Sequence, residues 1–181
     1  MPLERTQVDL ETAAAELDAQ LDEIAEEVAR IDPGERDSDN DEFVALRQRA
    51  TELEKQLGGI EWLIDEYGAD ATVTVTGLTA RETAVVGDRI RDLESETLTP
   101  TKSVESMSQV IWVAEGLEAA PFLEDGGDFE AAFAAVGGLP RQVLDWLDDQ
   151  ISELSTVGDR EGNSFAQRVA AKTETSPETS R

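Results

Sequence analysis

Three alternating aspartates, Asp37, Asp39 and Asp41, carry carboxylates that could together bind a metal ion. A D-x-D-x-D run opens the calcium-binding loop of EF-hands, where carboxylate oxygens hold the ion. That loop also needs glycine at its sixth position and a bidentate glutamate at its twelfth, but this chain has Glu42 and Gln48 there. The run therefore predicts a solvated acidic loop and not a calcium site.

Other catalytic and metal-binding patterns are absent from the sequence. The chain has no cysteine and no histidine, which excludes disulfides, thiolate metal sites and nucleophilic catalysis by either residue. It has no glycine-rich phosphate loop. Loop acids cluster at Glu124, Asp125 and Asp128, but chance pairs are common among 41 acidic residues, and Asp128 is placed to cap a helix. We predict that the protein is not an enzyme and binds no cofactor or metal.

The charge of the chain is extreme. Its 41 acidic residues against 15 basic ones give a formal net charge of −26. The acids are spread along the whole sequence, as in proteins of extreme halophiles, whose salt-rich cytoplasm screens repulsion between carboxylates. A nucleic-acid mimic or a binder of basic proteins is the alternative. Direct binding of nucleic acid is not expected, because no basic stripe is present to neutralise phosphates.

No stretch of the sequence approaches the ~20 apolar residues of a membrane-spanning helix. The opening residues MPLERTQVDLE lack the basic and then apolar segments of a signal peptide. We therefore expect a soluble, cytoplasmic protein without a membrane partner, located in the host cytoplasm if it is viral.

Apolar residues at heptad spacing organise the first third of the chain. They predict a helix over residues 3–31 and a second helix over 42–67, joined by the polar loop 32–42. The near-equal lengths favour an antiparallel coiled-coil hairpin, although one helix could instead pair with another chain. The heptad positions are Leu3, Leu10, Ala14, Leu17, Leu21, Ile24, Val28 and Ile31, then Phe43, Leu46, Ala50, Leu53, Leu57, Ile60, Ile64 and Tyr67.

A single strand is predicted after the hairpin, because Val73 and Val75 alternate with threonines over residues 71–76. One strand cannot satisfy its own backbone hydrogen-bonding groups. It must therefore pair with a partner chain, with a second copy, or with a segment whose strand character the pattern does not show.

The residues after the strand predict a small helical domain. Capping and breaking residues, including a capping box of Thr79 with Glu82, divide it into helices over 80–94, 101–117, 129–136 and 140–156. Their inner faces are expected to include Val85, Val86, Met107 and Ile111.

The whole chain is thus predicted to be mainly α-helical. It combines an antiparallel coiled-coil hairpin at 1–69, a helical domain with one short N-terminal β-strand at 70–157, and a disordered C-terminal tail at 158–181. The tail is assigned from its polar, serine- and threonine-rich composition.

Six residues are candidates for contact with a protein partner. They are Val73, Val75, Trp62, Trp112, Trp146 and Phe165. The two valines lie on the lone strand. The three tryptophans lie beside the predicted apolar stripes, so they either pack between hairpin and domain or contact a partner. The phenylalanine could form one amphipathic turn of the tail on a partner, or belong to an unbound tail.

The residues from the strand onward resemble a known family. The segment TVTVTGLT at 72–79 has the pattern x-V-x-V-x-x-L-T and leads into a capped helix. A late helix and a polar tail follow, with matching residues Leu139, Pro140, Val143, Leu147, Ile151 and Leu154. This order resembles the tail assembly chaperones of tailed phages, here of a haloarchaeal tailed virus, over about residues 70–160. The resemblance implies a non-enzymatic protein, often multimeric, that binds the tape measure protein and helps the tail tube to assemble.

These observations predict an interaction or assembly protein, most specifically a tail assembly chaperone with a long helical client. The alternative is a structural component of a viral particle or a cellular haloarchaeal coiled-coil adaptor. A homo-oligomer is a further expected form. A prefoldin-like holdase would share the helical hairpin, but prefoldins place β-hairpins between their helices, and the loop at 32–42 is too short for these.

Overall fold

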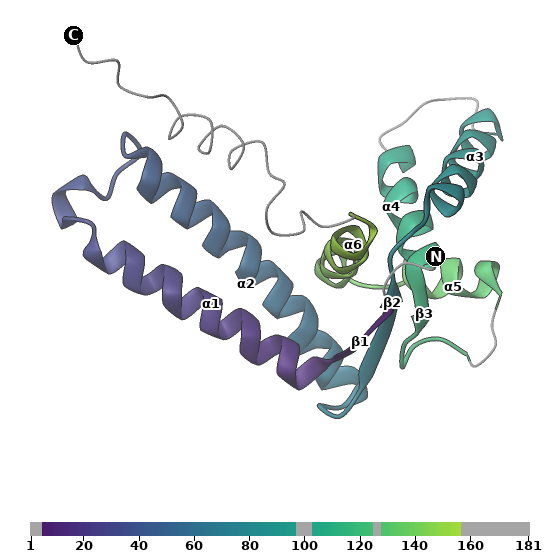
Figure 1. Ribbon diagram of the computed structural model, residues 1–181, viewed down its shortest axis with the longest axis horizontal. Coiled ribbons are helices and arrows are strands. Elements are labelled where there is room, and N and C mark those ends of the chain that lie inside the picture. The colour runs from purple at the N-terminus through teal and green to yellow at the C-terminus, as the bar shows by residue number, and fades with distance from the viewer. Residues whose placement is uncertain (1–4, 97–102, 125–127, 157–181) are drawn as a thin grey trace, which may run out of the picture.

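The computed structural model describes residues 5–96, 103–124 and 128–156. Within these residues the protein is mainly α-helical with a small antiparallel sheet (Figure 1), which confirms the predicted helical class. In chain order the elements are β1 (Arg5–Asp9), α1 (Leu10–Arg30), the 3₁₀ helix η1 (Pro33–Glu35), α2 (Asp41–Tyr67), β2 (Thr72–Thr76), α3 (Ala80–Glu96), α4 (Ser103–Gly116), β3 (Leu117–Ala119), α5 (Phe129–Gly137) and α6 (Arg141–Ser155). The predicted tail at 158–181 lies outside the described residues.

The first two helices form a long arm (Figure 1). α1 and α2 lie side by side and antiparallel, with η1 at the tip and the sheet at the base. At the tip, the Arg36 guanidinium donates hydrogen bonds to the carbonyl oxygens of Ala29 and Ile31 at 3.1 and 3.0 Å. These bonds satisfy carbonyls that the end of α1 would otherwise leave unpaired. Several predicted heptad residues are buried, namely Leu10, Leu17, Ile24, Leu53 and Ile60.

The first helix begins later than predicted. Residues 5–9 form strand β1, α1 starts at Leu10, and Leu3 lies outside the described residues. The cause is Asp9, whose carboxylate accepts a hydrogen bond from the amide of Thr12 at 2.8 Å and so caps the helix. The same hydrogen bond lowers the pKa of Asp9. The heptad spacing of Leu3 therefore did not mark a helix.

The strand at 72–76 is confirmed, but the prediction that the chain has one strand was wrong. β2 is the central strand of an antiparallel sheet with the order β1-β2-β3. β1 pairs with it along its full length, from Arg5 opposite Thr76 to Asp9 opposite Thr72. The pattern missed both neighbours because RTQVD contains one apolar residue and the three-residue LEA directly follows a helix.

One cluster of buried side chains joins the arm, the sheet and the later helices. α6 is central to it and packs on α2, α4 and β2. On α2, Gly59 permits this contact, since a Cβ atom there would lie 2.7 Å from the carbonyl oxygen of Gln142. Two domains were predicted to meet between residues 69 and 70. The sheet and this core both contain residues from each side of that boundary. The division into domains stays a prediction.

The caps of the later helices agree with the predictions. Thr79 and Glu82 form a capping box at α3, in which the Thr79 amide donates to the Glu82 carboxylate at 2.7 Å and the Glu82 amide donates to the Thr79 hydroxyl at 3.3 Å. Asp128 caps α5 by accepting a hydrogen bond from the amide of Ala131 at 3.1 Å. Local side-chain chemistry thus determines where these helices begin.

Two predicted inner-face residues are exposed. Val85 and Met107 have relative exposures of 36% and 37%, whereas Val86 and Ile111 are buried as predicted. α3 has α4 as its main neighbour, so only a narrow stripe of α3 is covered and Val85 lies outside it.

Candidate partner-binding site

The residues predicted to contact a partner are not gathered on one surface. Val73 and Val75 are 0% and 1% exposed, and their strand is paired on both edges, so neither faces a partner in this structure. Trp146 is 2% exposed and belongs to the core. Phe165 lies outside the described residues.

Trp62 and Trp112 are half-buried. The Trp62 ring meets Tyr67 edge-on with centroids 6.2 Å apart, and Tyr67 contacts Phe122 at the same distance. These rings pack the base of the arm against the segment after β3. Trp112 packs on the core, and its buried Nε1 has no hydrogen-bond partner among the described residues. All three tryptophans therefore pack within the protein.

The aspartate-rich loop at the tip of the arm makes local caps. Asp37 accepts a hydrogen bond from the amide of Asp39 at 2.9 Å, and Asn40 caps α2 through two backbone amides. Within residues 5–96, 103–124 and 128–156, no three side chains of the metal-binding types are grouped to hold an ion. No helix in the described part of the chain has the length and apolar character needed to span a bilayer.

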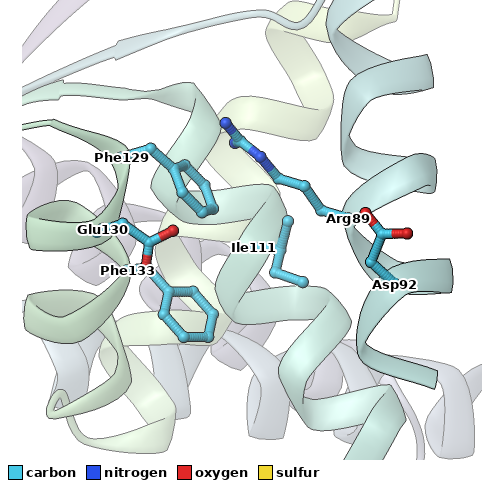
Figure 2. A pocket seen from close by; sticks show the side chains of 6 residues that line it. All are labelled: Arg89, Asp92, Ile111, Phe129, Glu130 and Phe133. Atoms are coloured by element: carbon cyan, nitrogen blue, oxygen red, sulfur yellow. The ribbon is translucent and has the colours of Figure 1, made fainter. Parts of the chain in front are cut away.

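A small aromatic pocket lies between α3, α4 and α5 (Figure 2). Its volume is about 190 Å³. Phe129 and Phe133 stack with centroids 5.9 Å apart, and the Arg89 guanidinium lies 3.4 Å from the centroid of the Phe129 ring. Arg89 is also paired with Glu115 on α4. The pocket has room for one apolar side chain, and its cation is already held by neighbours. Its lining consists of Arg89, Asp92, Ile111, Phe129, Glu130 and Phe133.

A larger and shallower groove runs along the half of α2 nearest the tip, and we call it the arm groove. Its volume is about 640 Å³. Three basic and two acidic side chains line it, which makes it locally positive in a chain of formal charge −26. The lining residues are Arg36, Asp37, Ser38, Phe43, Val44, Arg47, Gln48, Thr51, Glu52 and Lys55.

The arm groove continues the face of α2 on which α6 packs. Successive residues of an α-helix turn by about 100°, so Gln48, Glu52 and Lys55 lie on the same side as Gly59. Gly59 contacts α6, and the Gln56 side chain donates a hydrogen bond to Asp149 of α6. α6 thus covers this face near the base. α1 and α6 are the described elements that pack extensively on α2, so no described element covers this face near the tip.

Sequence reasoning missed the arm groove because it assigned Phe43 to a buried seam. Phe43 is half-buried at the groove, and the Arg47 guanidinium lies 5.8 Å from its ring centroid. A signal was present in the recurrence of Arg36, Arg47 and Lys55 within one short stretch of a chain that has 15 basic residues. Comparisons with protein-family models, curated proteins and solved structures found no match for this chain.

Proposed function

We propose that this protein is a non-enzymatic assembly factor that holds a helical segment of another protein in the arm groove, in a salt-rich cytoplasm. A single face of α2 binds a helix, α6, near the base, and near the tip no described element covers it. Helix-in-groove recognition uses such surfaces, on which an amphipathic helix lays its apolar side against a complementary face.

The chemistry of the arm groove suggests the character of the client helix. Phe43 and Val44 offer apolar contact, while Arg47 and Lys55 offer donors to carboxylates. The client is therefore an amphipathic helix with an acidic edge. Acidic helices are what other proteins of a salt-rich cell would present, and hydrogen bonds from Arg47 and Lys55 to their carboxylates act at contact, where salt screens least.

A tail assembly chaperone is our specific proposal, with the tape measure protein as its long helical client. The support is the resemblance of about residues 70–160 to that family. The alternative function is a structural component of a viral particle or a cellular adaptor, in which the same groove would hold a permanent partner. We also propose that α1 and α2 pack as a coiled coil, because Leu17, Ile24 and Leu53 are buried at heptad positions.

Photo-crosslinking in a salt-adapted host tests whether the groove meets a client. A crosslinking amino acid replaces Thr51, which is exposed in the groove, and in a control chain it replaces Glu23, which is exposed on α1. We expect crosslinks to one long helical protein from position 51 and not from position 23. Equal capture from both positions, or none from either, contradicts the proposal.

Charge reversal tests the chemistry with the purified client in 2 M KCl. Arg47→Glu combined with Lys55→Glu should weaken binding about tenfold, which corresponds to about 1.4 kcal/mol. Arg49→Glu is the matched control for each of the two single reversals, because Arg49 lies on the same helix but does not line the groove. An unchanged dissociation constant for the double variant would exclude the arm groove as the client site.

A further inference from the structure

Strand β1 has one neighbour in the sheet, β2, and its other edge is unpaired among the described residues. Its exposure alternates along the strand, with Arg5, Gln7 and Asp9 exposed and Thr6 and Val8 half-buried. An unpaired edge presents backbone amides and carbonyls that another strand can bond. We propose that two copies of this chain join antiparallel through the outer edges of β1, which makes one continuous sheet from two.

The register of β1 determines which backbone groups face outward. The amide of Leu10 donates to the carbonyl oxygen of Ala71 at 3.3 Å, which continues the β1–β2 register by one pair. In antiparallel sheets, hydrogen-bonded and non-hydrogen-bonded pairs alternate. Thr6 and Val8 share the phase of Leu10, so their backbone groups bond to β2.

The remaining residues of β1 have the opposite phase. The backbone amides and carbonyls of Arg5 and Gln7 and the amide of Asp9 therefore point away from β2, toward the open edge, whereas the Asp9 carbonyl begins the hydrogen bonding of α1. Their exposed side chains lie together on the outer face of the sheet, where the Gln7 amide donates to the Thr72 hydroxyl at 3.2 Å. Backbone donors and acceptors for a further strand thus lie at the three exposed positions.

The sequence of β1 is complementary to itself when it is reversed. With a two-fold axis at Gln7, Arg5 lies opposite Asp9 of the second copy, and Thr6 lies opposite Val8 of the second copy. Opposite charges on directly opposed residues stabilise a strand pair, and like charges destabilise it. This match favours a second copy over an unrelated strand and over a shifted register. Within its own chain Arg5 pairs with Glu118 of β3 at 2.6 Å, across β2 and away from the open edge, so the Arg5 guanidinium would exchange or share this partner when it meets Asp9 of the second copy.

Net charge makes this association dependent on salt. Two copies with a formal charge of −26 each repel one another at low ionic strength. The Debye length falls from about 10 Å at 0.1 M salt to about 3 Å at 1 M, so the repulsion is screened in molar salt. The backbone hydrogen bonds of the paired edges are short-range and persist. We expect light scattering to show a dimer in 2 M KCl that dissociates as the salt is diluted.

A cysteine crosslink tests the two-fold axis directly, because the chain has no cysteine of its own. In the proposed dimer the two Gln7→Cys residues form a hydrogen-bonded pair with Cα atoms about 5.5 Å apart, within reach of a disulfide. Two Arg5→Cys residues on the same strand would lie about 14 Å apart. Mild oxidation in 2 M KCl should link Gln7→Cys chains at least tenfold faster than Arg5→Cys chains.

A second pair of variants distinguishes the contribution of the backbone amide at the strand edge from that of the Gln7 side chain. Gln7→Pro removes an amide that points to the open edge and should give a monomer with unchanged far-ultraviolet circular dichroism. Gln7→Ala keeps that amide and should still form the dimer. The proposal is overturned if the unmodified chain is monomeric in 2 M KCl, if the two cysteine variants crosslink at equal rates, or if larger open polymers form.

Discussion

Amide side chains from two other helices donate hydrogen bonds to the three aspartates of α6. Gln109 on α4 donates hydrogen bonds to Asp145 and Asp148 at 2.9 and 3.0 Å, and Gln56 on α2 donates to Asp149. Burial raises the pKa of Asp149, the hydrogen bond from Gln56 opposes this shift, and nearby acids reinforce it. The ionised form of Asp149 is therefore disfavoured in the folded protein.

Replacing Asp149 by asparagine should stabilise the protein at neutral pH in low salt. The gain should be about 0.5 kcal/mol, because the carboxylate is only partly buried and solvent screens it. An acid with a raised folded pKa weakens the fold above that pKa, and the penalty disappears as pH falls below the ordinary value of 3.8. Urea unfolding at pH 7 should show the gain, and unfolding near pH 3 should not. Asp22→Asn, at an exposed position of α1, measures the general effect of removing one negative charge. An equal gain in stability from this variant would refute a cause local to Asp149.

Among the elements, α2 and α6 approach closely at Gly59, the second of two adjacent glycines on α2. At Gly59 a Cβ atom would meet the backbone of α6 at 2.7 Å, whereas at Gly58 its nearest neighbour, the Gln142 side chain, lies at 3.9 Å. Gly59→Ala should therefore destabilise the protein by about 1–3 kcal/mol, since the helices must move apart. Gly58→Ala should stabilise it by about 0.5–1 kcal/mol through helix propensity. Urea denaturation of both variants checks the difference, and two effects of the same sign would show that the helices do not pack this closely.

The sequence predicted the elements with local signals and missed those that depend on distant partners. The capping box of Thr79 with Glu82, the cap at Asp128 and the alternation of Val73 with Val75 all act within a few residues. β1 is a strand because β2 lies beside it, and its own composition carries little β signal. The heptad spacing also placed the start of the first helix at residue 3, before the N-cap Asp9, because spacing alone does not show where a capping residue begins a helix.

At the scale of the whole molecule, the candidate site depends on where α6 lies. The basic residues of the arm groove are visible in the sequence, but the sequence does not show that α6 covers the adjacent half of the same face. α6 crosses α2 near the base (Figure 1), so no described element covers the half of that face near the tip. Such a surface arises from packing between segments that are far apart in sequence, so no local pattern predicts it.

The net charge of the molecule should make its stability depend on salt. With a formal charge of −26, folding brings carboxylates together, and their repulsion is weakened as the Debye length shortens. The melting temperature should rise by about 10 °C between 0.1 and 2 M KCl, equivalent to roughly 3–4 kcal/mol for a chain of this size. Circular dichroism at a fixed protein concentration measures it.

The shape of that salt response distinguishes screening from a general exclusion of solute. Screening follows the Debye length, so most of the rise should occur below about 1 M salt. Sucrose, which is excluded from protein surfaces but carries no charge, should stabilise the fold gradually and without this early rise. A melting temperature that is flat in KCl, or that rises in the same way in KCl and in sucrose, would mean that carboxylate repulsion does not limit the stability of this fold. The acidic surface would then need an explanation other than adaptation to salt.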